Sequence, residues 1–277
     1  MAWIPGGRFC MGSDVFYPEE RPARHVDVGG FWIDPGPVSN ADFVRFVEAT
    51  RYITLAERAD TGPAGALVFR PTEGSVPLNN PSAWWHFVAG ACWHAPEGLG
   101  STVAGRQNHP VVQIALADAR AYAVWAGKRL PAEAEWEYAA RGGRDGAAYA
   151  WGAEPNPGGR FMANTWQGGF PWADTAEDGF AGTSPIGSFP LNGYGLADMI
   201  GNVWEWTVDV FAPADDGTRP VCCGGAEPGK NQVYYAVKGG SFLCAPDYCQ
   251  RYRPAARQPQ TADTATCHLG FRCVRDA

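Results

Sequence analysis

The sequence lacks the features that mark several common classes of protein. Charged residues make up only 18% of its 277 residues, and the formal net charge is −7. Nucleic-acid binding is not expected, because phosphate contacts need clustered lysine and arginine. No run of about eighteen apolar residues predicts a transmembrane helix, and the start, MAWIPGGRFCMGS, has no signal-peptide pattern. We therefore expect a cytoplasmic protein without nucleic-acid or membrane partners, and a monomer.

Several catalytic signatures are missing as well. The five histidines are dispersed, and none has the His-Glu-x-x-His spacing of a zinc protease. There is no Gly-x-Ser-x-Gly turn, no phosphate-binding P-loop and no Gly-x-Gly-x-x-Gly fingerprint. Nucleotide chemistry is therefore not expected. A Ser-His-Asp triad stays compatible with the sequence, because its members meet only in space.

Glycine and proline, by contrast, are abundant, with 35 and 23 residues, and hydrophobic residues reach 45%. This composition can bury a core and predicts many turns with little regular secondary structure. No repeat, low-complexity linker or block of charge divides the chain. We expect one α+β domain over residues 1–277.

Three helices are predicted. The first spans Asn40–Thr50, with Ser39 or Asn40 as its N-cap. The second spans Leu116–Ala126 and ends at Gly127. The third spans Pro131–Arg141, because proline suits the first helical turn. Strands are expected in HVDVGGFWI, VYYAVKGGSF and LGFRCVR.

The third predicted helix carries acidic residues at helical spacing. Glu133 and Glu137 share a face, and Arg141 follows Glu137 by four residues. Paired carboxylates can perform acid–base chemistry. We interpret the Glu137–Arg141 spacing instead as a solvated ion pair that supports the helix.

The eight cysteines should be mostly reduced in a cytoplasmic protein. Cys10 and Cys92 are interpreted as small apolar residues, and the adjacent Cys222 and Cys223 as part of an exposed glycine-rich loop. A four-thiol zinc site is not expected, because structural zinc sites use two closely spaced pairs. The candidate zinc ligands would be the four cysteines nearest the C-terminus, and the spacing between them is too loose for two such pairs: Cys244, Cys249, Cys267 and Cys273.

Cys244 and Cys249, with four residues between them, lie behind a glycine pair in KGGSFLCAPDYCQRYR. Arg251 and Arg253 would favour thiolate over thiol. Two thiolates without imidazole or carboxylate suit a soft ion such as Cu(I). The pair alone leaves a disulfide, a redox couple and a Cu(I) site open.

The surrounding motifs resemble those of the formylglycine-generating enzymes, also called sulfatase-modifying factors. The resemblance includes KRLPAEAEWEYAARGG, NGYGLADMIGNVWEWT, GGSFLCAPDYCQRYR and LGFRCVR. It implies a variant C-type-lectin-like fold. It also implies a copper-dependent oxidase that uses O2 to convert a cysteine in a C-x-P-x-R motif of a sulfatase polypeptide to formylglycine.

The resemblance also assigns residues. It implies that Cys244 and Cys249 hold Cu(I), that Ser241 is an active-site serine and that Trp204 lines the site. Arg251 would have a supporting role in substrate binding.

Two structural calcium sites are implied by the same resemblance. Acidic residues among glycines would otherwise be interpreted as Asx turns, although carboxylates and backbone carbonyls are also the ligands that calcium prefers. The first site would comprise Asn164, Thr165, Asp178 and Phe180, and the second Asp198, Gly201, Val203 and Glu205. Carbonyl oxygens would ligate from Thr165, Phe180, Gly201 and Val203.

The sequence departs from the family pattern at four positions. Ala245 and Asp247 replace the histidine and serine that many members carry between the two cysteines. Ala123 and Pro254 stand where secreted members have disulfide cysteines. Two alternative functions therefore stay open: a lectin-like binding module without catalysis, and a same-fold oxygenase acting on another thiol substrate.

Overall fold

A computed structural model describes residues 1–60, 62–212 and 232–277. Its helices are α1 (Asn40–Thr50), α2 (Leu116–Trp125) and α3 (Glu133–Arg141). Short 3-10 helices are η1 (Pro18–Glu20), η2 (Leu55–Glu57), η3 (Pro81–Ala83) and η4 (Pro157–Gly159). The strands are β1 (Ala2–Ile4), β2 (Gly7–Met11), β3 (Arg24–Val28), β4 (Phe31–Ile33), β5 (Gly65–Phe69), β6 (Trp85–Ala89), β7 (Trp204–Val210), β8 (Tyr234–Lys238), β9 (Arg257–Thr261), β10 (Leu269–Gly270) and β11 (Val274–Asp276).

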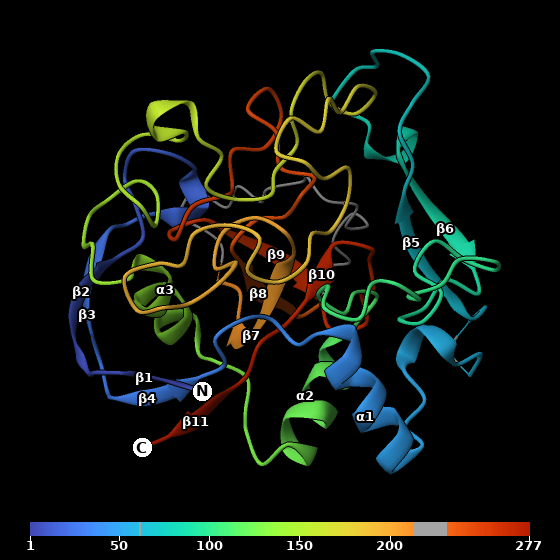
Figure 1. Ribbon diagram of the computed structural model, residues 1–277, viewed down its shortest axis with the longest axis horizontal. Helices are drawn as coiled ribbons and strands as arrows, with labels where there is room; N and C mark the ends of the chain where they lie inside the picture. Colours follow the sequence, from blue (N-terminus) through green and yellow to red (C-terminus); the bar gives the residue numbers. More distant parts are fainter. Residues whose placement is uncertain (61, 213–231) are drawn as a thin grey trace.

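These short strands form four small sheets. A four-stranded sheet with the order β10-β7-β8-β9 lies at the centre, and β1-β4-β11 brings the two termini to one edge (Figure 1). The β2-β3 and β5-β6 hairpins lie on opposite sides of the central sheet in this view. Long loops connect the elements, so the expected α+β architecture with little regular structure is confirmed.

The main core lies between the central sheet and the helices. Phe43 and Phe46 of α1 contact the ring of Tyr122 on α2, at centroid distances of 6.0 and 5.6 Å. Phe271, which follows β10, also packs on Tyr122 at 5.2 Å. These aromatic contacts attach α1 and α2 to the segment that carries the C-terminal strands.

The first two helices agree closely with the predictions. Ser39 caps α1, because its Oγ accepts a hydrogen bond from Asp42 N at 3.1 Å. The second helix ends at Trp125 rather than Ala126, and Gly127 follows with a φ of +65°. No helix in the described ranges is both long and apolar enough to cross a membrane.

The third helix begins two residues later than predicted. Pro131 lies outside α3, and its carbonyl accepts a hydrogen bond from Val208 N of β7 at 3.0 Å. The side chain of Asp209 accepts from Glu133 N at 2.5 Å, which caps the true start of the helix. The tertiary contact with β7 therefore keeps Pro131 out of the helix.

The predicted strands appear, but they are divided. HVDVGGFWI contains β3 and β4, separated by Gly29 and Gly30, and LGFRCVR contains β10 and the start of β11. Within VYYAVKGGSF only β8 is a strand, because Gly239 and Gly240 adopt positive φ values of +98° and +75°.

The prediction of a solvated Glu137–Arg141 pair was wrong. Their side chains are only 1% and 5% exposed. Glu137 also accepts from Lys238 Nζ at 2.9 Å and from Gly12 N at 2.8 Å. The helix α3 packs between the β2-β3 hairpin and the central sheet, so this face has no access to water. The pair is structural but buried, and Lys238 supplies a second compensating charge.

Candidate thiol-centred active site

A sharp turn after β8 carries the two thiols. A Cβ on Gly239 would lie 2.9 Å from Met199 O, and one on Gly240 would lie 2.8 Å from Arg251 O. Both residues also have positive φ, so glycine is needed for conformation and for space. The turn directs the chain after β8 into the protein interior, where Ser241 begins the thiol loop.

Cys244 and Cys249 come together at the centre of this loop. Their sulfur atoms are 3.7 Å apart, and each residue is 1% exposed. A disulfide bond would be about 2.05 Å long, so the sulfurs are not bonded. Two backbone hydrogen bonds fix the cysteines: Cys244 N donates to Ser241 O at 2.9 Å, and Cys249 N donates to Ala245 O at 2.8 Å. The thiol pair predicted from the sequence is therefore a preformed feature of the fold.

Arg251 contacts the thiol pair directly. Its Nη1 lies 3.6 Å from Cys249 Sγ, and its Nε donates to Glu19 Oε1 at 2.8 Å. The guanidinium also lies over the Tyr17 ring, 3.8 Å from the centroid. Arg251 thus presents a positive charge to the sulfur while Glu19 compensates that charge. Its role in substrate binding stays a prediction.

Arg253, two residues after Arg251, anchors the thiol loop. Its Nη1 donates to Glu20 Oε2 at 2.8 Å, its Nε donates to Gln250 O at 2.8 Å, and it stacks on Phe16 at 3.7 Å. Both Arg253 and Glu20 are almost fully buried. Arg253 therefore holds the loop to η1.

Ser241 lies beside the thiol pair, as predicted. Its backbone N approaches Cys244 Sγ at 3.4 Å, and its Oγ accepts from Leu243 N at 3.2 Å. The same Oγ lies 3.0 Å from His268 Nδ1. The hydroxyl is thus held in one orientation by two neighbours.

His268 is a site residue that the sequence reasoning missed. It is fully buried, and burial lowers its pKa to about 3, opposed by the nearby Cys249. The imidazole is therefore neutral at physiological pH. Its ring packs on Trp85 at 4.9 Å. The sequence offered no signal, because His268 lies 27 residues from Ser241 and belongs to no spacing motif.

Trp204 lies at the start of β7 and is 1% exposed. Its backbone N donates to His268 O at 2.9 Å, which joins β7 to the segment before β10. Its side chain belongs to the same buried cluster as Cys244 and Cys249. Trp204 therefore lies in the main hydrophobic core, to which the two cysteines also belong, and its predicted place in the lining of the site stays a prediction.

The two departures inside the cysteine loop have structural explanations. Ala245 is fully buried in a cluster of aromatic side chains that includes Trp84 and Trp85. Asp247 Oδ2 accepts from Phe170 N at 3.2 Å. The ring of Phe170 in turn stacks on Tyr248 at 4.5 Å. The substituted residues therefore attach the loop to the segment around Phe170.

The other cysteines do not join the thiol pair. Within the described ranges, neither Cys267 nor Cys273 belongs to a group of three or more ligand atoms within 4.8 Å. Burial raises the pKa of Cys267 to about 12 and also raises that of Cys273. Cys222 and Cys223 lie outside the described residues.

The residues of the first calcium set lie close together. Thr165 N donates to Asp178 Oδ2 at 3.1 Å, and Phe180 N donates to Asp178 Oδ1 at 3.0 Å. The Asn164 side chain donates to Gly182 O at 2.8 Å, whereas its buried Oδ1 has no hydrogen-bond partner. An orphaned buried amide oxygen fits a hard cation. Asp178 Oδ2 also accepts from Gln167 Nε2 at 3.0 Å, so an ion would share this oxygen with the amide.

The residues of the second calcium set fit a cation less well. Both Glu205 oxygens accept from Arg272, at 2.7 and 2.8 Å, and one also accepts from Trp136 Nε1 at 2.7 Å. An ion here would have to share Glu205 with a buried guanidinium. Asp198 Oδ2 accepts from Gly187 N at 3.0 Å.

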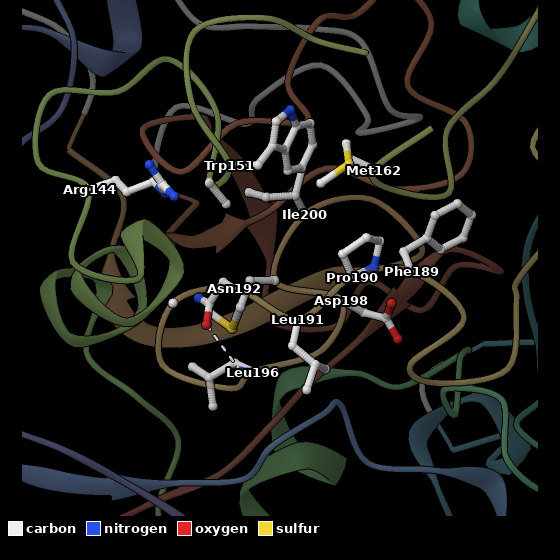
Figure 2. A pocket seen from close by; sticks show the side chains of 13 residues that line it. Arg144, Trp151, Met162, Phe189, Pro190, Leu191, Asn192, Leu196, Asp198 and Ile200 are labelled. Atoms are coloured by element: carbon white, nitrogen blue, oxygen red, sulfur yellow. Dashed lines mark hydrogen bonds between the residues drawn. The ribbon is translucent and has the colours of Figure 1, made fainter. Parts of the chain in front are cut away.

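Asp198 also lines a pocket of about 330 Å³ between the loops around Trp151 and Asn192. Figure 2 shows the Asp198 carboxylate and Arg144 at opposite ends of this pocket. Asn192 Oδ1 accepts from Leu196 N at 3.1 Å, which holds the lower loop closed. The pocket contains neither thiol of the pair, so it is separate from the candidate active site.

Comparisons with known proteins identify relatives of this chain. The formylglycine-generating enzyme of Mycobacterium tuberculosis is 54% identical, over 99% of this chain and 96% of its own length. The mouse enzyme of that name is 45% identical, over 100% and 75%. A mouse protein named inactive C-alpha-formylglycine-generating enzyme 2 is 40% identical, over 100% and 86%.

A solved structure supports the fold alone. PvdO from Pseudomonas aeruginosa matches with a TM-score of 0.68 and 24% identity, over 99% of this chain and 93% of that one. The sequence of this chain matches the sulfatase-modifying factor enzyme 1-like domain over residues 1–277. Together with the two enzymes above, this match shows that the chain belongs to the formylglycine-generating enzyme (sulfatase-modifying factor) family.

Proposed function

We propose that this protein oxidises a cysteine in a C-x-P-x-R motif of a sulfatase polypeptide to formylglycine, using O2 and a Cu(I) ion. The single observation that carries the proposal is the preformed thiol pair, with sulfur atoms 3.7 Å apart in a buried loop. Family membership supports it, through the relatives that are named formylglycine-generating enzymes. Family membership alone does not imply activity, because another relative is named inactive. The thiol pair is therefore the observation that favours catalysis.

The residues around the pair fit a soft monovalent ion. Cys244 and Cys249 would hold Cu(I), since thiolate ligands select it, and the bound ion would supply one-electron chemistry with O2. Arg251 stabilises negative charge on Cys249. Ser241 and the neutral His268 place a hydroxyl and an imidazole beside the pair without adding charge. Buried aromatic rings exclude bulk water from this region.

A pocket of about 400 Å³ offers a route for the substrate polypeptide. Its wall includes Phe242 and Trp166. Trp166 N donates to Cys244 O at 3.1 Å, so this wall borders the thiol loop. The carboxylates of Glu97 and Asp174 also line the pocket. Since Glu97 is already paired with Arg106, Asp174 is the better partner for a substrate arginine.

The test is turnover of a peptide by the copper-loaded protein. We would incubate it with O2 and a peptide that contains C-x-P-x-R, and measure the mass change of cysteine-to-formylglycine conversion. Cys244→Ala and Cys249→Ala should each abolish product. Cys10→Ala, at a thiol on the β2-β3 hairpin, should retain it.

Three results would contradict the proposal. Absence of product from several such peptides with fully copper-loaded protein would favour a lectin-like binding module. Product formation that persists without either thiol of the pair would exclude their proposed role. Oxidation of small thiols but not of peptides would favour the same-fold oxygenase.

Calcium at the first set, Asn164 to Phe180, is part of the proposal. Chelation should lower the thermal midpoint of the wild-type protein, and Asp178→Asn should remove most of that response. At the second set, calcium stays a prediction. The cytoplasmic location, the monomeric state and the single-domain organisation also stay predictions.

A further inference from the structure

A second group of metal-ligating side chains lies away from the thiol pair. In the described part of the chain, Glu57, Cys92 and His94 each offer one ligand atom, and these three atoms lie within 4.8 Å of one another. The sequence reasoning treated Cys92 as a small apolar residue. In the fold its thiol lies beside a carboxylate and an imidazole, and the three groups together could bind a metal ion.

A tight turn fixes two of the three side chains. Cys92 N donates to Ala95 O, and Ala95 N donates to Cys92 O, both at 3.1 Å. These reciprocal bonds close the turn around Trp93 and His94. The thiol and the imidazole therefore come from one short, preorganised segment. This preorganisation lowers the conformational entropy that the segment would lose when it binds an ion.

The third side chain comes from η2, and its position is fixed independently. Glu57 Oε2 accepts from Thr54 N at 2.9 Å and from Thr54 Oγ1 at 2.6 Å. The other oxygen, Oε1, faces His94 Nε2 at 3.4 Å. One carboxylate oxygen thus holds the local structure while the second points into the cluster.

The cluster has a buried side and an open side. Cys92 is 4% exposed and packs among small apolar residues such as Ala56 and Ala91. The His94 side chain is 52% exposed. Three protein ligands would therefore surround an ion from the interior, and solvent would fill a further position.

A simple His94–Glu57 ion pair does not account for this arrangement. A half-exposed pair of that kind contributes little to stability, and it gives no reason for a thiol at the same point. A cation bound at this point would displace the proton of the Cys92 thiol, because a coordinating thiol is deprotonated.

We propose that Glu57, Cys92 and His94 form a binding site for a divalent transition-metal ion of borderline softness, with Zn²⁺ as its occupant. Sulfur, imidazole nitrogen and carboxylate oxygen are the three ligand types of protein zinc sites. The mixed set differs from the all-thiol pair, which suits a soft monovalent ion. Three ligands with one solvent position match zinc sites that keep an open coordination position.

The first test is a Co²⁺ titration of the full-length, metal-free protein under reducing conditions. Thiolate-to-cobalt absorption should appear and saturate at one equivalent for this site. Cys92→Ala should remove that absorption, whereas Cys10→Ala and the Cys244→Ala/Cys249→Ala double variant should keep it. The double variant separates this proposal from the proposed function, because it removes the copper ligands and leaves this cluster intact.

The second test measures Zn²⁺ affinity by competition with a chromophoric chelator. Loss of a second-shell partner weakens metal binding by about 10–100-fold, so loss of the ligand in His94→Gln should weaken it at least about 100-fold. His94 is exposed, so this variant should fold normally even if Cys92→Ala does not. Wild-type cobalt absorption that is absent, or that persists in Cys92→Ala, would overturn the proposal. Unchanged zinc affinity in His94→Gln would overturn it as well.

Discussion

The two thiol neighbourhoods of this protein differ in how they are held. The loop of Cys244 and Cys249 is buried and tied to η1 by two arginine–glutamate pairs. The turn of Cys92 is closed by two backbone hydrogen bonds, and its histidine is half exposed.

The difference shows that surroundings, rather than the cysteine itself, decide the chemistry. In the first region Cys249 Sγ lies beside the Arg251 guanidinium and Cys244 Sγ beside the Ser241 backbone N–H, and the Ser241 hydroxyl contacts a neutral imidazole. In the second region one thiol lies within 4.8 Å of a carboxylate oxygen and an imidazole nitrogen. The first favours a soft ion in a dry site, and the second favours a borderline ion in contact with water.

The largest effect should follow from breaking the anchor of the thiol loop. Glu20→Gln leaves the buried Arg253 without a compensating charge, so the free energy of unfolding should fall by about 3–5 kcal/mol. Urea denaturation measures this change. Glu48→Gln, on the exposed face of α1, is the matched control. Equal stability of the two variants would show that the anchor has no role.

A smaller effect is expected inside the loop. His268→Leu removes the partner of Ser241 Oγ, a hydrogen bond worth about 1–1.5 kcal/mol. The rate constant kcat for peptide oxidation should therefore fall about tenfold, with little change in KM. His268→Gln keeps a polar partner and should recover most of the rate. If kcat falls equally in both variants, loss of the hydrogen bond to Ser241 Oγ does not explain the effect.

Asp247→Ala tests the attachment of the loop to Phe170. Loss of the 3.2 Å bond to Phe170 N should cost about 1 kcal/mol of unfolding free energy. Thermal denaturation would detect it, with Asp263→Ala as an exposed control. A more stable variant would contradict the structural role given to this departure.

The smallest effect concerns pH and the second region. Asp118 accepts from Leu55 N at the start of η2, and burial raises its pKa. Between the ordinary value near 4 and the raised one, the folded state binds more protons than the unfolded state. Stability should therefore fall as pH rises through that window. Asp118→Asn should remove this slope, which denaturation at several pH values would show. An unchanged slope would mean that another group titrates.

Much of the thiol site could be predicted because its residues are close in sequence. Ser241, Cys244, Cys249 and Arg251 form one motif, and local backbone bonds bring them together. Helix α1 was equally predictable, because its cap and apolar stripe are local. His268 could not be predicted, since the contact with Ser241 depends on how β10 pairs with β7.

The same distinction explains the wrong predictions. Pro131 has good intrinsic preference for a first helical turn, but its carbonyl pairs with β7 instead. The Glu137–Arg141 pair has the spacing of a surface ion pair, but Lys238 and the β2-β3 hairpin cover it. In each case a partner distant in sequence decides the outcome.

The pairing of Glu19 and Glu20 with Arg251 and Arg253 spans 232 and 233 residues. Such non-local contacts form late and slow the folding of a chain. During synthesis, the two glutamates emerge long before their arginines, so they must stay hydrated until nearly the whole chain is available. The thiol loop is attached to η1 only once these charge pairs have formed. An incomplete chain would therefore lack the two charge pairs that hold the thiol loop against η1.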